Sequence, residues 1–251
     1  MMIKRERTHL VISDREGNAL DRHIKELKSV KRGKATFPKN QDELTKRYSR
    51  YLEEIVDRTW VVIKLSQKIL SGETVNEYTR VDLDLCYLQL RKAMECLAYA
   101  LSLFHRISKE SLSESNLRTY KIGQIFKELE KRNPHFFPKP SKIVEVDGVV
   151  QITDREPLPD FPSLTRKQAE DIYSIMCGNE LHADHDYNRL DTNSAMERAL
   201  FLNHAARAVL GLLSYHRVNL DDQYMLVAGI SDKKNSEEGA FAQIGFRTRN
   251  F

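Results

Sequence analysis

The sequence predicts a mainly α-helical protein, in which a helical bundle carries two small β-hairpins. Apolar residues recur at intervals of three and four along several stretches of the 251-residue chain, which is the spacing of one buried helix face. Two shorter stretches instead combine β-favouring residues with turn-forming ones, as hairpins do. A chain of this length buries one sizeable core, so a single helical domain over residues 42–251 is expected.

The first two long helices are predicted from their apolar spacing. One is expected from Asp42 to Ser71, because Gly72 follows its last apolar residues and glycine commonly follows a helix C-terminus. The other carries the most regular pattern in the chain, a seam about six turns long that alternates intervals of four and three. The residues of this seam are Leu83, Tyr87, Leu90, Met94, Leu97, Leu101 and Phe104.

Three further helices are expected downstream. The third spans residues 113–132, beginning at a capping serine and ending before an Asn-Pro pair, where proline disfavours helix in the preceding residue. A shorter helix, capped by Ser163 or Thr165, continues to about residue 176. The last covers about residues 192–216, and its alanines allow close packing. Its buried edge is predicted to be Ala195, Ala199, Leu202, Ala206, Val209 and Leu213.

Two hairpins are expected between and after these helices. Residues 134–162 hold six of the seven prolines and enclose IVEVDGVVQI, where an Asp-Gly pair separates two β-favouring runs. This pattern predicts a hairpin excursion near residues 143–152. Near the C-terminus, QYMLVAGIS and GAFAQIGFR flank a polar turn, which predicts a second hairpin near residues 223–246.

Basic residues are concentrated at the N-terminus. Residues 1–50 contain 14 Lys or Arg and 7 Asp or Glu, a net charge of +7, whereas the whole chain is only +4, so the remainder is −3. Residues 1–41 are therefore expected to form a basic, partly flexible arm. Such an arm is interpreted either as a solvated leader or as a segment that contacts RNA phosphates.

Composition excludes several classes of protein. No apolar run approaches the roughly 20 residues that span a bilayer, and the N-terminus lacks the apolar stretch of a signal peptide, so a cytoplasmic protein without membrane contact is expected. The three cysteines show no C-x-x-C spacing, which disfavours a disulfide framework or structural zinc site. No phosphate-cradling glycine-rich loop or G-x-S-x-G elbow is present, and no cofactor is expected.

The polar stretch CGNELHADHDYN, at residues 177–188, is the main candidate for chemistry. His182 and His185, with the aspartates beside them, are residue types that bind metals, although no further ligands are marked elsewhere in the chain. The same stretch also has the composition of a plain connection between two helices. A third interpretation is a metal-free proton-transfer site, in which His182 lies near the helix that carries Arg91 and Glu95.

Two segments resemble HEPN-type helical domains of uncharacterised bacterial proteins. They are LRKAMECLAYA at residues 90–100 and IYSIMCGNELHADHDYN at residues 172–188, followed in the same order by a long helix and LLSYHRVNL. Within them, L-R-K-x-x-E and C-G-x-x-L-H are the specific parts. The resemblance implies a helical bundle, often a homodimer, from toxin or anti-phage defence systems, whose active members are metal-independent ribonucleases.

The usual HEPN signature is an arginine, four to six residues and a histidine, and this chain departs from it. Only Arg198 and His204 have that spacing, and six residues of helix place them about 120° apart. The resemblance instead places His182 at the motif histidine, with Asn179 where a polar or basic partner is expected.

Metal-free RNA cleavage assigns roles to these residues. It requires a base, an acid and a cation for the charge that builds on the phosphate. His182 would serve as base or acid and Arg91 as the cation, oriented by Glu95 one turn later. The alternative for Arg91 and Glu95 is an ordinary ion pair on the helix surface.

Two functions follow from these patterns. The first is a HEPN-like protein that acts on or binds RNA, with the basic arm on the phosphates and His182 near the site. The second is a non-catalytic interaction module, in which the apolar seam of residues 83–104 and the C-terminal hairpin build a dimer.

Overall fold

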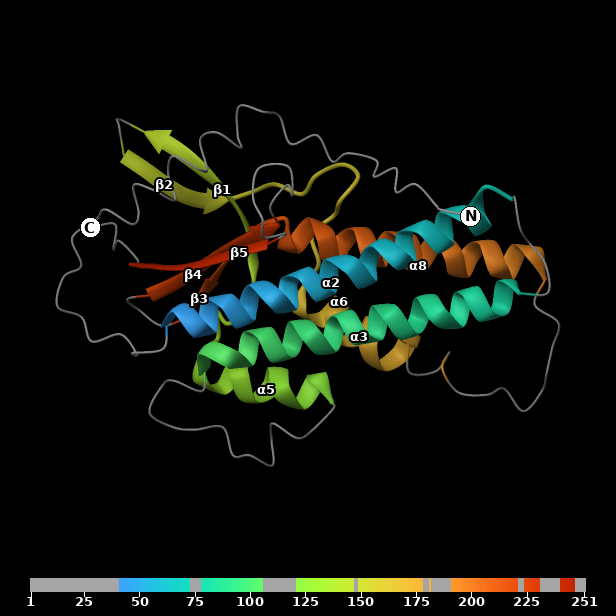
Figure 1. The fold of residues 1–251 in the computed structure, drawn as a ribbon, viewed down its shortest axis with the longest axis horizontal. Helices are drawn as coiled ribbons and strands as arrows, with labels where there is room; N and C mark the ends of the chain where they lie inside the picture. The colour runs from blue at the N-terminus through green and yellow to red at the C-terminus, as the bar shows by residue number, and fades with distance from the viewer. Residues whose placement is uncertain are drawn as a thin grey trace. The chain divides into compact units, whose positions relative to one another are not determined.

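Three long helices form the bundle that the sequence predicts. The computed structural model describes residues 41–72, 78–105, 121–146, 149–177, 181, 191–220, 224–230 and 240–246. Helices α2 (Gln41–Leu70), α3 (Thr79–His105) and α8 (Thr192–Leu213) pack against one another, with α2 and α3 lying side by side (Figure 1). The protein is predominantly helical. Within the described ranges, no helix is long and apolar enough to cross a membrane.

The regular seam of α3 lies in the core. All seven of its residues are buried, and Leu90, Met94 and Leu97 are fully enclosed where α3 packs on α2 and α8. Fully burying a side chain of this size contributes about 1.5–3 kcal/mol. The interaction-module hypothesis placed this seam at a dimer interface. That placement is wrong, because all seven seam residues are already buried within the single chain.

Helix α5 (Ile122–Arg132) packs on α3 and begins later than expected. Lys121 has an extended backbone, so the predicted helix over residues 113–132 is not continuous; residues 113–120 lie outside the described part of the chain. The buried residues Ile122, Ile125, Phe126 and Leu129 follow helical spacing, which accounts for the helix from residue 122 onward. Its end at Arg132, before Asn133, agrees with the prediction.

The strands form a larger sheet than two separate hairpins. Their order is β2-β1-β3-β4-β5, with bounds β1 Lys139–Val146, β2 Val149–Asp154, β3 Tyr215–Asn219, β4 Tyr224–Ile230 and β5 Ala240–Phe246. Both predicted hairpins are present, as the antiparallel pairs β1–β2 and β4–β5. The strand that was missed is β3, which pairs with β4 along its length and with β1 at two positions.

Strand β3 replaces the last turn of the expected final helix. Helix α8 ends at Leu213 instead of His216, and the five residues of β3 alternate half-buried and buried side chains. Neither glycine nor proline follows Leu213 before β3, so the sequence carries no stop signal after this helix end. The consequence is that β3 joins the two hairpins into one sheet.

A buried histidine attaches this sheet to the bundle. His216 of β3 is fully enclosed; its Nε2 lies 2.8 Å from the Tyr48 hydroxyl of α2, and its Nδ1 lies 3.2 Å from the Leu213 carbonyl oxygen. A carbonyl oxygen can only accept, so Nδ1 carries the proton and Nε2 accepts from Tyr48. Burial lowers the pKa of His216 from 6.5 to about 4, which keeps the ring neutral.

The proline-rich segment is held tightly against α8. A Cβ atom on Gly211 would lie 2.5 Å from the Phe161 carbonyl oxygen and 2.6 Å from that of Pro162, so only glycine fits there. Arg155, just after β2, donates to the Ser214 hydroxyl at 2.8 Å and to the Gly211 carbonyl oxygen. These contacts close the C-terminal end of α8.

Helix α6 (Arg166–Asp171) then begins at a reciprocal cap. The Thr165 hydroxyl accepts from the Gln168 backbone N–H at 3.3 Å, and the Gln168 side chain accepts from the Thr165 N–H at 2.8 Å. Of the two caps that the sequence allowed, Thr165 is the one used. A short π-helix, η1 (Ile172–Met176), follows directly.

Replacing Gly211 with Ala is expected to lower the free energy of unfolding by about 1–3 kcal/mol, because backbone atoms of the adjacent loop cannot easily yield. Gly123→Ala is the matched control. Its new Cβ would meet only a Glu170 side-chain oxygen at 4.0 Å, and alanine favours helix, so no loss of stability is expected. Urea unfolding compares the two variants. Equal effects would contradict the close approach at Gly211.

His216 makes stability depend on pH. The unfolded chain binds this proton near pH 6.5 and the folded chain only near pH 4, so stability falls as the pH is lowered through this range. Between about pH 7.5 and about pH 5, His216 is expected to lower the free energy of unfolding by about 2 kcal/mol. His216→Gln should lose this part of the pH dependence, as measured by urea unfolding at both pH values. An unchanged pH dependence in the variant would refute the assignment.

Candidate functional site

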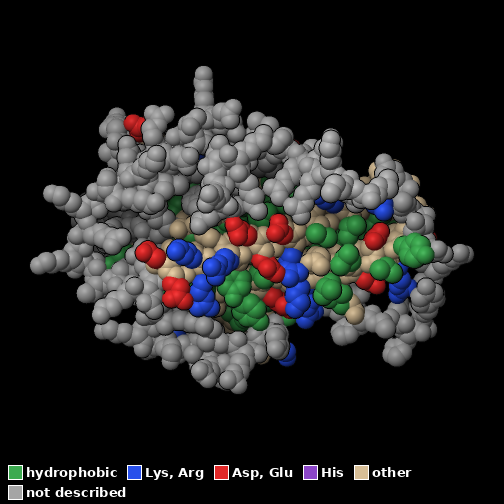
Figure 2. All heavy atoms as spheres, viewed as in Figure 1, with side chains coloured by type: hydrophobic (Ala, Val, Ile, Leu, Met, Phe, Trp, Pro, Cys, Tyr) green, Lys and Arg blue, Asp and Glu red, His purple; other side chains and the backbone are tan. Residues whose placement is uncertain are grey.

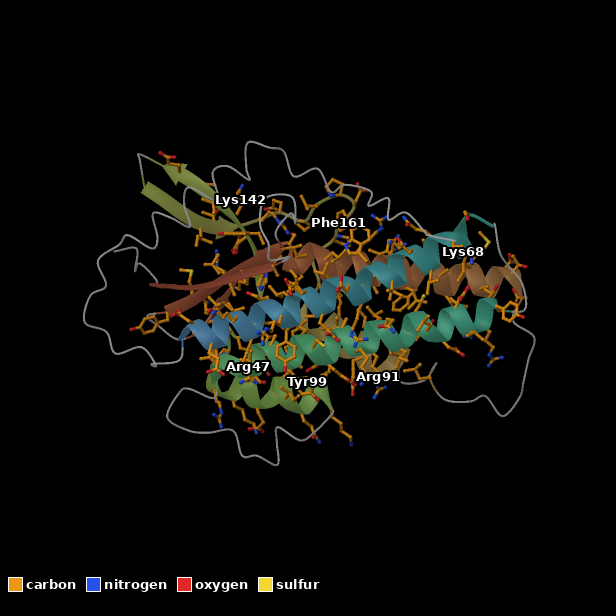
Figure 3. All side chains as sticks on the ribbon, in the orientation of Figure 1. Arg47, Lys68, Arg91, Tyr99, Lys142 and Phe161 are labelled. Carbon is orange, nitrogen blue, oxygen red and sulfur yellow. The ribbon has the colours of Figure 1, made fainter. Side chains whose placement is uncertain are left out.

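The two segments that carry the resemblance meet where η1 packs against α3. The Arg91 guanidinium of α3 lies over the ring of Tyr173 of η1, 4.4 Å from its centroid, and its Nη2 donates to the Tyr173 hydroxyl at 3.1 Å. Figure 3 shows Arg91 where α3 passes the segment that contains α6. A cation over an aromatic face is stabilised by about 0.5–2 kcal/mol, depending on its exposure. Tyr173 therefore fixes the plane and position of this guanidinium.

A buried carboxylate lies beside the arginine. Glu95 is only 7% exposed; Lys92 Nζ is 2.9 Å from its Oε2, and Arg91 Nε is 3.5 Å from its Oε1. A buried charge is costly unless it is paired, and here two cations provide the pairing. The expected Arg91–Glu95 pair is therefore present, but the closer partner of Glu95 is Lys92. The three ionised groups together carry a net charge of +1.

Arg91 retains binding capacity. Its side chain is 30% exposed, and its ion pair with Glu95 and its hydrogen bond to Tyr173 involve Nε and Nη2. Among the described residues, its Nη1 has no hydrogen-bond partner. A guanidinium that is oriented on one side and accessible on the other is suited to bind an oxyanion such as a phosphate.

The π-helix determines where Tyr173 lies. In η1, the Cys177 backbone N–H donates to the Ile172 carbonyl oxygen, which adds a residue to the turn relative to an α-helix. Single π-helical turns occur frequently at functional sites. Burial raises the pKa of Tyr173, with Arg91 acting in the opposite direction, so the phenol keeps its proton at neutral pH.

Cys177, at the end of η1, is part of the packing. It is fully buried, and burial raises the pKa of its thiol to about 12, although the nearby Arg91 acts to lower it. A thiol of this kind is inert as a nucleophile at neutral pH. The charge of Arg91 thus reaches Cys177, the first residue of the polar stretch.

The other predicted residues fall into two groups. Asn179, His182 and His185 lie outside the described residues, so their roles stay predictions. Arg198 and His204 both lie on α8, which runs unbroken from Thr192 to Leu213, so helical geometry separates their directions by about 120°. Within the part of the chain that the structure describes, no three His, Cys, Asp or Glu side chains are grouped to hold a metal ion.

Tyr173 is the site residue that sequence reasoning missed. It lies inside the quoted segment IYSIMCGNELH, but the sequence signals a helix there and contains no feature that predicts a π-helical turn. One available signal was its aromatic ring, which can bind a cation such as the nearby arginine. Only the packing of η1 on α3 selects Arg91 as that cation.

No protein family, curated protein or solved structure was found to match this chain at a significant level. The resemblance to HEPN-type domains therefore remains a prediction from the two segments.

The contact between Arg91 and Tyr173 is expected to stabilise the fold measurably. Tyr173→Phe keeps the ring but removes the hydroxyl acceptor, and we expect it to lower the free energy of unfolding by about 0.5–1.5 kcal/mol. A double-mutant cycle with Arg91→Ala should give a coupling energy of about 0.5 kcal/mol or more by urea unfolding. A coupling energy of zero would show that the two side chains do not interact through the hydroxyl.

Proposed function

We propose that this chain is a cytoplasmic, HEPN-like protein that acts on or binds RNA, with a phosphate group bound at the cluster of Arg91, Lys92, Glu95 and Tyr173. The proposal includes metal-independent cleavage of RNA and a role in a toxin or anti-phage defence system. It extends to the basic arm of residues 1–41 as a further phosphate contact and to a homodimer as the functional form.

One observation carries this proposal: L-R-K-x-x-E and Tyr173, from the described start of the segment at residues 172–188, meet at an arginine that is held in place yet remains accessible. Tyr173 and Glu95 restrain the guanidinium, and 30% of the Arg91 side chain is exposed. An arginine that served only as a surface ion pair would not require a buried aromatic platform and a buried carboxylate. This favours a binding role for Arg91 over the ordinary ion pair.

The proposed cleavage uses the 2′-hydroxyl of the RNA as nucleophile. A base removes its proton, the 2′-oxygen forms a bond to phosphorus, and the bond from phosphorus to the 5′-oxygen breaks as an acid protonates that oxygen. The products are a 2′,3′-cyclic phosphate and a 5′-hydroxyl. His182 is proposed as base or acid, and Asn179 as its polar partner. Arg91 stabilises the negative charge on the phosphate, and Glu95 orients Arg91.

The competing function, a non-catalytic interaction module, is supported by a different observation. Apolar side chains remain exposed on the outer side of α3, at Val81, Leu85 and Leu88. A module of this kind would use that surface without any reaction at Arg91.

The decisive experiment incubates mixed cellular RNA with purified protein in excess chelator and examines the products by gel electrophoresis. We expect cleavage by the wild-type protein and a loss of at least about a hundredfold in His182→Ala and in Arg91→Ala. Arg166→Ala is the matched control. Arg166 is similarly exposed, at 26%, and pairs with Glu130 and Glu170 on the surface of α5 and α6.

The outcomes separate the functions. Cleavage that survives in both site variants would place the reaction elsewhere or in a contaminant. No cleavage by the wild type, together with RNA affinity that Arg91→Ala does not reduce, would reject the RNA proposal in favour of the interaction module. Loss of cleavage in Arg91→Ala but not in Arg166→Ala would support the proposal.

A further inference from the structure

A second arginine, Arg207 of α8, is held in place by neighbouring groups away from the Arg91 cluster. Its Nε donates to the Asn203 side-chain oxygen at 2.8 Å, and its guanidinium carbon lies 5.4 Å from the centroid of the Phe161 ring. The Arg207 side chain is half-buried. In Figure 3, Phe161 and Arg91 lie on opposite sides of α2. The two arginines therefore belong to different places on the bundle.

A line of buried hydrogen bonds orients the Asn203 amide toward Arg207. The Ser66 hydroxyl of α2 donates to the Ile63 carbonyl oxygen at 3.1 Å, and Asn203 Nδ2 donates to Ser66 Oγ at 2.9 Å. Because Ser66 has only one proton to give, its oxygen must accept from Asn203, which turns the amide oxygen to the Arg207 Nε–H. Ser66 is fully buried and Asn203 is 6% exposed. Buried polar groups are costly unless they are bonded, and this line ends at the guanidinium.

The Phe161 ring supports the guanidinium from its face. The Phe161 carbonyl oxygen lies against Gly211, one helical turn after Arg207, where an added Cβ atom would be only 2.5 Å away. The Phe161 N–H donates to the Leu158 carbonyl oxygen at 3.1 Å. These two backbone contacts fix the ring, and an aromatic face attracts a cation. The glycine at position 211 thus brings the loop close enough for Phe161 to reach Arg207.

Arg207 differs from several other half-buried arginines in its charge balance. Those that pair with carboxylates are Arg58, Arg91, Arg166 and Arg217. Over the α2–α3 face, Figure 2 likewise shows Lys and Arg side chains beside Asp and Glu. Within the described ranges, Arg207 has no carboxylate partner, and only the Nε–H of its five N–H donors is hydrogen-bonded. A half-buried cation is costly without a counter-charge, so an anion from outside the chain would complete this arrangement.

We propose that Arg207 binds the oxyanion group of a small ligand, a phosphate or a carboxylate, through its two Nη nitrogens. A guanidinium donates two parallel hydrogen bonds to two oxygens of one such group, and charge makes these bonds roughly twice as strong as neutral ones. Asn203 and Phe161 act as positioning residues, because they hold the guanidinium and do not touch the ligand. This site is separate from the Arg91 cluster, and the inference does not rest on RNA binding or cleavage.

The first test follows the Arg207 Nε–H group by ¹H–¹⁵N NMR in the full-length wild-type chain. Its hydrogen bond to a buried oxygen slows exchange with water, so the signal should be visible, and its loss in Arg207→Gln identifies it. Inorganic phosphate and sodium acetate are titrated separately, with sodium chloride keeping the ionic strength constant. We expect a saturable shift with a dissociation constant of about 1–10 mM. The ion that binds more tightly identifies the group as phosphate or carboxylate.

The second test separates binding from a purely structural role of Arg207. Arg207→Lys keeps the charge but loses the planar fork, so its affinity for the preferred ion should fall at least about tenfold. That ion should also raise the urea midpoint of the wild type, and of the control Arg47→Gln at an exposed position of α2, but not of Arg207→Gln. Comparison between variants removes the general effect of the salt on stability.

Several results would overturn the inference. One is the lack of a saturable shift of the Arg207 signal with either ion up to about 100 mM. Another is an ion-dependent rise in the urea midpoint that Arg207→Gln retains, since Arg207 would then serve only to hold the Phe161 loop. Failure of the proposed function reads out differently, because it appears as unchanged RNA cleavage or binding in Arg91→Ala. That variant should leave the titration of the Arg207 signal unchanged.

Discussion

Burial of one side of α3 against α2 and α8 is the constraint on which the other features depend. Leu90, Met94 and Leu97 are fully enclosed there, and a rotation of α3 about its axis would expose them to water. At about 1.5–3 kcal/mol for each large apolar side chain, the packing determines which residues face outward. The packing of the seam thereby fixes the direction in which every other side chain of α3 points. Arg91 and Glu95 face η1, and Leu85 and Leu88 face away from the bundle.

Glu95 connects this packing to the chemistry of the site. A carboxylate that is only 7% exposed is stable only with cationic partners, and Lys92 and Arg91 supply them from the same helix. Tyr173 reaches the cluster from η1 and adds a hydrogen bond and an aromatic face. The cation is thus restrained by groups from two elements that are far apart in sequence. This preorganisation means that binding an anion there requires little further ordering of the arginine.

In the sheet, the sequence signals that predict each hairpin do not reveal how the two hairpins are joined. Each hairpin was predictable, because turn residues and β-favouring runs are adjacent in the chain. The joining of the two hairpins into one sheet was not predictable, because it depends on β3. This five-residue strand directly follows a 22-residue helix, with no glycine or proline between them. Strand β3 is held against α2 by His216, whose neutral ring is buried and hydrogen-bonded to Tyr48. Contacts of this kind have no signature in local sequence.

The sequence by itself determined the predominantly helical class, the limits of α2, the apolar seam of α3, a choice of two caps for α6 and the positions of both hairpins. Each of these depends on interactions between residues a few positions apart, which periodicity and capping chemistry report directly. The tertiary structure alone decided that the seam of α3 is core and not interface, that β3 unites the hairpins, and that Tyr173 is the partner of Arg91. These outcomes depend on which surfaces of different elements meet, and Arg91 and Tyr173, for example, are 82 residues apart in the chain. A side chain's own type and spacing do not contain that information, because the same apolar row can pack against its own chain or against another.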